Sequence, residues 1–230
     1  MSFRIFIADD HEVVRKGLMS LLEKHADWEV CGEAAEGREA VDKVAKLKPH
    51  VVVLDIGMPN LNGLEATRQI LKDNPDARVL ILTLHDSDHL VREVLNAGAR
   101  GFLLKSDAAR DLVAAVEALL RDKTYFTSKV AALVLEGYLN GGGVPGPSKR
   151  SHNRLTPRER EIVQLLAEGK STKEVAVALG LSVKTAETHR SNIMRKLQIH
   201  SVSDLVLYAV RNNIVHVVQP LPTPPTGSGQ

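Results

Sequence analysis

Five polar residues with reactive or charged side chains stand where apolar stretches of the first half of the chain end. Asp9 and Asp10 follow one such stretch, Asp55 follows a second, Thr83 closes a third and Lys105 follows a fourth. Three carboxylates in one place repel one another, and a cation among them relieves that repulsion. Ligands that are all oxygen favour a hard ion such as Mg²⁺. An aspartate can accept a phosphoryl group. The Lys105 ammonium and the Thr83 hydroxyl could stabilise the charge of that group. The five residues together therefore predict a site where Asp55 is phosphorylated with the help of Mg²⁺.

Each of these residues also has an ordinary structural interpretation when it is taken alone. Asp9 or Asp10 could cap the helix that follows, Thr83 could be a plain strand residue, and Lys105 could be a surface lysine. The occurrence of all five at the ends of apolar stretches favours a functional site over these alternatives.

In the first half of the chain, apolar stretches alternate with amphipathic stretches. This pattern is typical of a parallel sheet covered by helices, and these elements would position the five residues. The expected strands cover residues 4–8, 28–34, 50–54, 79–83 and 101–104. The expected helices lie near residues 12–25, 37–47, 63–73, 86–97 and 107–121. In a doubly wound five-stranded parallel sheet of order 2-1-3-4-5, ligands bind beyond the carboxyl ends of the strands, between strands 1 and 3. We therefore expect the three aspartates to converge there.

The second half is different, because it consists of short helices that each begin at a capping signal. Thr156-Pro157 is followed by Glu159, and Ser171 and Ser201 are each followed three residues later by an acid. The expected helices cover residues 156–168, 172–179, 182–196 and 202–212. Between the halves we expect a further helix over 128–139 and a Gly- and Pro-rich linker over 140–148. Residues 219–230 are predicted to be disordered.

Charge is distributed unevenly along the chain. Residues 1–136 carry a net charge of −4 and residues 137–230 a net charge of +6, within an overall charge of +2. A basic second half suggests that this half alone meets a polyanion such as nucleic acid, although a surface bias without function is the alternative. Aromatic residues make up only 3% of the chain, which argues against stacking on single-stranded nucleic acid or sugars.

Several locations and cofactors are disfavoured by composition. No apolar run is longer than residues 205–210, which is far shorter than the roughly 18 to 20 residues of a membrane span, and the sequence opens without a signal-peptide pattern. Cys31 is the only cysteine, so an internal disulfide and a cysteine-based zinc site are excluded. We expect a soluble, cytoplasmic protein.

One predicted helix of the basic half, residues 182–197, has the pattern of a helix that enters DNA. Its apolar residues recur at three- and four-residue steps and define an expected buried stripe of Val183, Ala186, Ile193 and Leu197. Polar residues recur at the same steps on the opposite face, at Lys184, Thr188, Ser191 and Arg195. A short helix and a Leu-Gly-Leu turn precede it, which is helix-turn-helix geometry. In that motif the second helix lies in the major groove.

Residues 3–122 resemble a response-regulator receiver domain, whose motif positions are matched by Asp9-Asp10, Asp55, Thr83 and Lys105, with the family's Asp-x-x-Met-Pro at 55–59. The resemblance implies that Asp55 is the phosphoacceptor. It implies that Asp10, Asp55 and the Gly57 carbonyl bind Mg²⁺, with Asp9 acting through water. It also implies that Thr83 and Lys105 grip the phosphoryl group.

Three further residues lie near this expected site. Phe102 occupies the position where the family has an aromatic switch residue, which would act together with Thr83. The alternative is that Phe102 is an ordinary core residue. His11 and His85 flank the site, but the family often carries histidines there without metal binding. We therefore expect neither of them to be a metal ligand.

Residues 155–210 resemble the LuxR-type helix-turn-helix of the NarL/FixJ group of regulators. The matching segments are Leu155–Glu161, Ala167–Lys170, Lys173–Ala176 and Val183–His189. The resemblance implies that base edges face Glu187, Thr188 and Ser191. It implies that the phosphates face Lys184, Thr185, Asn192 and Lys196. Some relatives have lysines where this chain has Glu187 and Ser191, so fewer strong base contacts are available from basic side chains.

Together these patterns predict a non-enzymatic, two-domain transcriptional regulator. The expected divisions are a receiver domain over 1–122, a linker over 123–153, a helix-turn-helix domain over 154–217 and a tail over 218–230. The implied partners are a histidine kinase that phosphorylates Asp55, promoter DNA, and a second copy of the chain in a phosphorylated homodimer that uses residues 201–212. The alternatives are an aspartyl-phosphate phosphohydrolase, and a constitutive DNA-binding protein with a structural receiver.

Overall fold

The structure is a computed structural model that describes residues 2–85, 87–127, 130 and 155–215. Its first part is a five-stranded parallel sheet with the strand order 2-1-3-4-5, as the sequence predicts. The strands are β1 (Phe3–Ala8), β2 (Trp28–Ala34), β3 (Val51–Asp55), β4 (Arg78–Thr83) and β5 (Gly101–Leu104). Every residue of β3 is buried, because helices cover both faces of the sheet, and its first four residues are accordingly all apolar.

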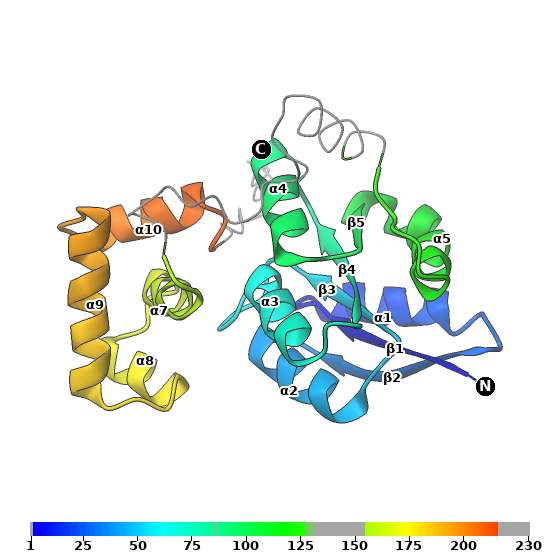
Figure 1. Cartoon of the computed structure of the whole chain (residues 1–230), viewed down its shortest axis with the longest axis horizontal. Helices are drawn as coiled ribbons and strands as arrows, with labels where there is room; N and C mark the ends of the chain where they lie inside the picture. The colour runs from blue at the N-terminus through cyan, green and yellow to red at the C-terminus, as the bar shows by residue number, and fades with distance from the viewer. Residues whose placement is uncertain (1, 86, 128–129, 131–154, 216–230) are drawn as a thin grey trace, which may run out of the picture.

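Two separate hydrophobic cores lie on the two faces of the sheet (Figure 1). One face is covered by α1 (Glu12–Leu22) and α5 (Ala108–Leu120), which begins after the short 3₁₀ turn η1 (Lys105–Asp107). The other face is covered by α2 (Gly37–Leu47), α3 (Gly63–Asp73) and α4 (Asp88–Ala97). Alternate residues of β1 serve the two cores, since Ile5 packs on one side and Phe6 on the other.

The second part contains four helices around their own core (Figure 1). They are α7 (Pro157–Ala167), α8 (Thr172–Ala178), α9 (Val183–Leu197) and α10 (Val202–Arg211). The predicted starts are confirmed, since Thr156 and Ser171 each form a reciprocal capping box with the glutamate three residues later. Gly180 has a φ of +63° in the turn between α8 and α9, a conformation that glycine adopts without steric cost.

Some element boundaries differ from the sequence predictions. The helix expected over 12–25 ends at Leu22, and the one expected over 86–97 begins at Asp88. The prediction that Val183 belongs to the buried stripe of α9 is wrong, because its position at the first turn of the helix leaves it 39% exposed. Apart from residue 130, the helix expected over 128–139, the linker over 140–148 and the tail over 219–230 lie outside the described residues. Within the described ranges, no helix is long and apolar enough to cross a bilayer.

Candidate functional site

The carboxyl edge of the sheet gathers the three predicted aspartates. Ala8 of β1 pairs with Leu54 of β3, so the residues that come next along the two strands, Asp9 and Asp55, lie at the same edge. Ligand atoms of Asp9, Asp10, Asp55 and His11 all lie within 4.8 Å of one another. Asp9 and Asp55 are buried, at 0% and 4% exposed. The convergence predicted from the ends of the apolar stretches is therefore present.

Lys105 supplies the positive charge that this buried cluster needs. Its Nζ lies 2.7 Å from Asp9 Oδ2 and 3.0 Å from Asp55 Oδ2. Burial raises the pKa of Asp55 to about 6, and the charge of Asp9 adds to this rise while Lys105 opposes it. Burial alone would lower the pKa of Lys105, but the carboxylates of Asp55 and Asp9 raise it overall. Lys105 therefore stays protonated beside the two aspartates.

The aspartates also have oxygen atoms that a hard cation could use. Asp9 Oδ2 and Asp10 Oδ1 are buried and receive no hydrogen bond of good geometry. Asp9 Oδ2 lies 2.7 Å from Lys105 Nζ, and Asp10 Oδ1 lies 2.6 Å from His11 Nδ1. Buried carboxylate oxygens that receive no hydrogen bond of good geometry are suitable ligands for a divalent ion that binds oxygen. This donor set suits Mg²⁺.

Of the remaining predicted residues, Thr83 and Gly57 lie at the same edge as the cluster, and Phe102 lies in the core. Thr83 follows Leu82, which pairs with Asp55, and the Thr83 hydroxyl accepts a hydrogen bond from the His85 backbone N–H at 3.2 Å. Phe102 is fully buried in β5, in the core that faces α4. Gly57 begins the turn after β3 and lines, together with Asp10, a cavity of about 170 Å³.

The structure also places His11 among the aspartates, where sequence reasoning gave it no ligand role. Its backbone N–H donates to Asp9 Oδ1 at 2.9 Å, and its Nδ1 approaches Asp10. The signal for this contact was only its position directly after Asp10 in the chain.

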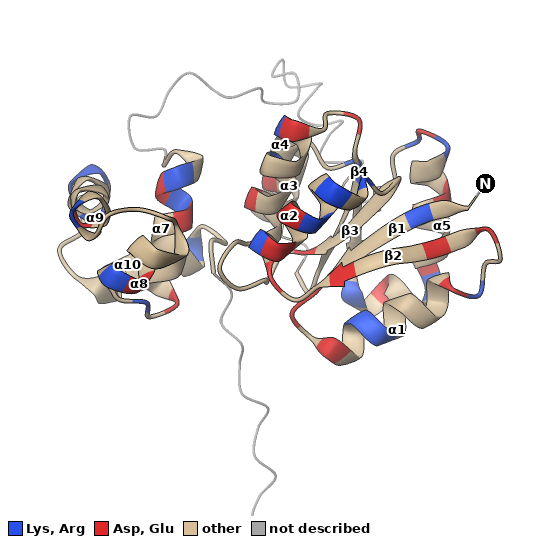
Figure 2. Ribbon diagram, turned by 90° about the horizontal axis from the view of Figure 1, so that it is seen from below, with Lys and Arg blue, Asp and Glu red and all other residues tan. Residues whose placement is uncertain are grey.

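The predicted DNA-facing residues lie together on one helix, α9. Six of them are exposed or partly exposed, namely Lys184, Thr185, Glu187, Thr188, Ser191 and Asn192. The seventh, Lys196, is half-buried, and its ammonium is paired at 2.7 Å with Glu159 of α7. Figures 1 and 2 both place α9 on the side of its domain away from the receiver sheet, with Lys and Arg segments visible on it in Figure 2. Among the described residues, this face of α9 is exposed.

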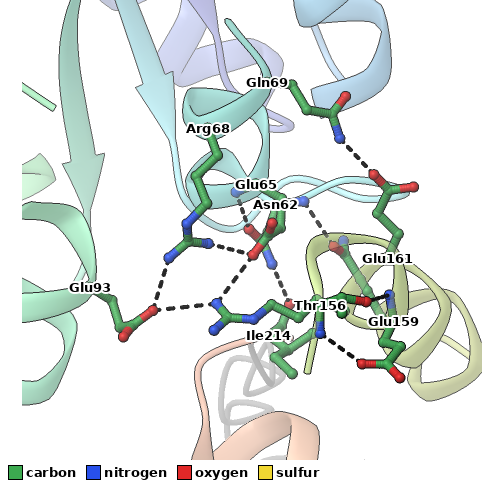
Figure 3. Close-up of polar contacts among 11 residues, drawn as sticks. Asn62, Glu65, Arg68, Gln69, Glu93, Thr156, Glu159, Glu161 and Ile214 are labelled. Atoms are coloured by element: carbon green, nitrogen blue, oxygen red, sulfur yellow. Dashed lines mark hydrogen bonds and ion pairs between the residues drawn. The ribbon is translucent and has the colours of Figure 1, made fainter. Parts of the chain in front are cut away.

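Sequence reasoning missed a polar contact between the two parts of the chain (Figure 3). Glu161 and Gln164 of α7 are only 4% and 1% exposed. Glu161 accepts hydrogen bonds from Gln69 of α3 at 2.6 Å and from Arg38 of α2 at 3.1 Å. Gln164 contacts the turn between β3 and α3. The available signal was a polar stripe on α7, which is usually a solvated face.

A group of charged side chains on α3, α4 and α7 forms a second part of the contact between the two domains. Arg160 of α7 lies 3.2 Å from Glu65 of α3 and 3.3 Å from Glu93 of α4. Arg68 pairs with both of these glutamates. Burial raises the pKa of Glu65, which the two arginines partly offset. Alternating charges thus join α3, α4 and α7.

The fold and the acid cluster define the first part as a receiver domain, and the four helices define the second as a helix-turn-helix domain. Residues 5–117 match the family model of the response regulator receiver domain, and residues 153–209 match that of bacterial regulatory proteins, luxR family. The chain belongs to the response regulators that join these two domains, and it is a DNA-binding transcriptional regulator of the phosphorylation-controlled kind.

Similarity to known proteins extends over most of the chain. Transcriptional regulatory protein LiaR of Bacillus subtilis is 38% identical over 213 residues, which cover 93% of this chain and 99% of LiaR. Oxygen regulatory protein NreC of Staphylococcus carnosus is 39% identical over 214 residues, with coverage of 92% and 99%. A structure of RcsB from Salmonella enterica serovar Typhimurium, bound to promoter P1flhDC in the presence of phosphomimetic BeF3-, is 29% identical with a TM-score of 0.57, covering 90% of this chain and 98% of that one.

Proposed function

We propose that Asp55 accepts a phosphoryl group from a histidine kinase and that this modification controls the binding of promoter DNA by α9. The observation that carries the proposal is the buried Asp55 carboxylate, which lies 3.0 Å from Lys105 among two further aspartates. The same chain carries a helix-turn-helix whose second helix is exposed. Both functions are thus provided by separate domains of one polypeptide.

The chemistry follows from the positions of the side chains. An Asp55 oxygen forms a bond to phosphorus while the bond from phosphorus to the donor's leaving atom breaks. Mg²⁺, held by Asp10, Asp55 and the Gly57 carbonyl with Asp9 acting through water, would neutralise charge on the transferring phosphoryl group. Lys105, whose ammonium lies 3.0 Å from Asp55 Oδ2, stabilises the same charge. Thr83 is at the correct edge to hold the phosphoryl group, and Thr83 and Phe102 are the proposed switch residues.

Recognition of DNA is assigned to the exposed face of α9. Glu187, Thr188 and Ser191 face the base edges in this proposal. Lys184, Thr185 and Asn192 contact phosphates, which supply much of the affinity and its salt dependence. Lys196 contributes to phosphate binding only if its ion pair with Glu159 opens.

We further propose that the DNA-bound form is a homodimer that pairs through α10. One recognition helix contacts few base pairs, so two copies on symmetric half-sites are needed for specificity. Val202 and Leu207 of α10 are large apolar residues that are 48% and 52% exposed. The pairing of two such surfaces would remove them from water.

The test of this function is phosphoryl labelling of the full-length chain. Incubation with acetyl phosphate and Mg²⁺ should add one acid-stable, base-labile phosphoryl group, and chelation of Mg²⁺ should prevent it, because the unscreened carboxylates would face an incoming anion. Asp55→Asn should not be labelled. Equal labelling of Asp55→Asn and wild type would refute the assignment of Asp55. Steady hydrolysis of phosphate monoesters would instead support a phosphohydrolase.

A further inference from the structure

Lys196, in the last turn of α9, is a predicted phosphate contact that is bound within its own domain. Its Nζ lies 2.7 Å from Oε2 of Glu159 in the first turn of α7. The side chains of Lys196 and Glu159 are only 24% and 17% exposed. Because partly buried ion pairs are screened by salt less than exposed ones, this pair holds the ammonium more firmly than a pair on the open surface would.

Lys196 lies on the same side of α9 as two other predicted phosphate contacts. Asn192 precedes it by four residues and Thr185 by eleven, which is about one turn and about three turns of the helix. Asn192 and Thr185 are exposed, whereas the Lys196 ammonium is bound to α7. The lysine is therefore on the edge of the helix where phosphates are expected, but its charge is used inside the domain.

The capping box of α7 keeps Glu159 in place when Lys196 moves. Glu159 Oε2 also accepts a hydrogen bond from the Thr156 backbone N–H at 2.7 Å (Figure 3). Burial alone would raise the pKa of Glu159, but the hydrogen bonds from Lys196 and Thr156 lower it overall, so the carboxylate is charged at neutral pH. A phosphate that took Lys196 would therefore leave a fixed negative charge behind.

Release of Lys196 from this pair would add one phosphate contact to α9. Each such contact steepens the dependence of log affinity on log salt concentration by about 0.9, which is about 3.5-fold in affinity for a fourfold change in salt. The carboxylate also repels the phosphates of an approaching duplex. The ion pair between Lys196 and Glu159 thus opposes DNA binding by competing for the ammonium.

We propose that Glu159 is a positioning residue that withholds Lys196 from DNA phosphates and thereby limits the sequence-independent part of the affinity for DNA. The proposal rests on the recognition of DNA by α9 that is proposed above. Phosphate contacts carry no direct sequence information, so the restraint lowers binding to all duplexes alike. A larger share of the binding free energy then comes from the base contacts, which do carry that information.

The experiment titrates a duplex of arbitrary sequence with full-length wild type, Glu159→Gln, Lys196→Ala and the double variant, all in the same phosphorylation state. Glutamine also forms capping boxes, so Glu159→Gln removes the charge and keeps the start of α7, which circular dichroism checks. Glu159→Gln should bind more tightly than wild type, and its affinity should fall about 3.5-fold further over a fourfold rise in salt. Most of this gain should disappear when Lys196→Ala is also present.

Glu174→Gln is the matched control, because Glu174 forms the same kind of capping box with Ser171 at the start of α8. Its effect on affinity should be the same with and without Lys196→Ala. An unchanged affinity and salt dependence in Glu159→Gln, or an equal gain with and without Lys196→Ala, would overturn the proposal. Wild-type affinity in Lys184→Ala would instead overturn the assignment of DNA recognition to α9.

Discussion

Replacing Asp55 by asparagine should stabilise the receiver domain at neutral pH in the absence of metal. Burial raises the pKa of Asp55 from 3.8 to about 6. A carboxyl group with a raised pKa in the folded state contributes stability that is fully present below pH 3.8 and is lost as pH rises through about 6. The shift corresponds to roughly 3 kcal/mol of unfolding free energy at about pH 8. Because the side-chain amide of asparagine cannot ionise, Asp55→Asn should avoid most of this loss.

Urea unfolding can be followed through Trp28, the only tryptophan of the chain, which lies in β2 and reports on the receiver. With chelator present, wild type should lose stability between about pH 4 and pH 7, and Asp55→Asn should lose much less over the same range. Asp122→Asn is the matched control, because a hydrogen bond from Arg78 lowers the pKa of Asp122, so the same substitution should bring no gain. Equal pH dependence in wild type and Asp55→Asn would refute the reasoning.

Three further outcomes are expected. Lys105→Ala should slow labelling by acetyl phosphate about a hundredfold, because it removes the ammonium beside Asp55; a normal rate would remove Lys105 from the mechanism. Lys184→Ala should weaken binding to all duplexes and reduce the salt dependence by about one ion, whereas Thr188→Ala should change sequence preference, as filter binding at several salt concentrations would show. If neither does so, α9 does not contact DNA. Leu207→Glu should leave the fold intact, since Leu207 is 52% exposed, but should abolish the tighter binding to paired half-sites in gel shifts; unchanged binding would exclude α10 from the dimer.

The elements and the acid cluster could be predicted because their signals are local. Asp9 and Asp55 end strands that adjoin in the predicted sheet order, so the topology alone brings them together. Thr156 and Glu159, which form the capping box of α7, indicate the start of this helix within four residues of sequence. Such signals depend only on residue type and on spacing along the chain, so they can be recognised without knowledge of the tertiary structure.

The contact between the domains could not be predicted in this way. Gln164 contacts Asn62, which lies 102 residues away in the chain, and a polar residue beside a buried apolar stripe normally faces water. Gln164 is a polar residue that is buried, whereas Val183 is an apolar residue that is exposed. The type and spacing of Val183 indicate burial, but its place at the first turn of α9 leaves it at the edge of the core. In both cases the outcome depends on which surface packs against the helix.

The most direct test of the central claim is a DNA titration with an inverted-repeat duplex at fixed salt, using wild type and Asp55→Asn, each with and without acetyl phosphate and Mg²⁺. Phosphorylated wild type should bind more tightly and have the mass of a dimer in light scattering, and Asp55→Asn should not respond to the donor. Identical affinity and identical mass in all four samples would contradict it.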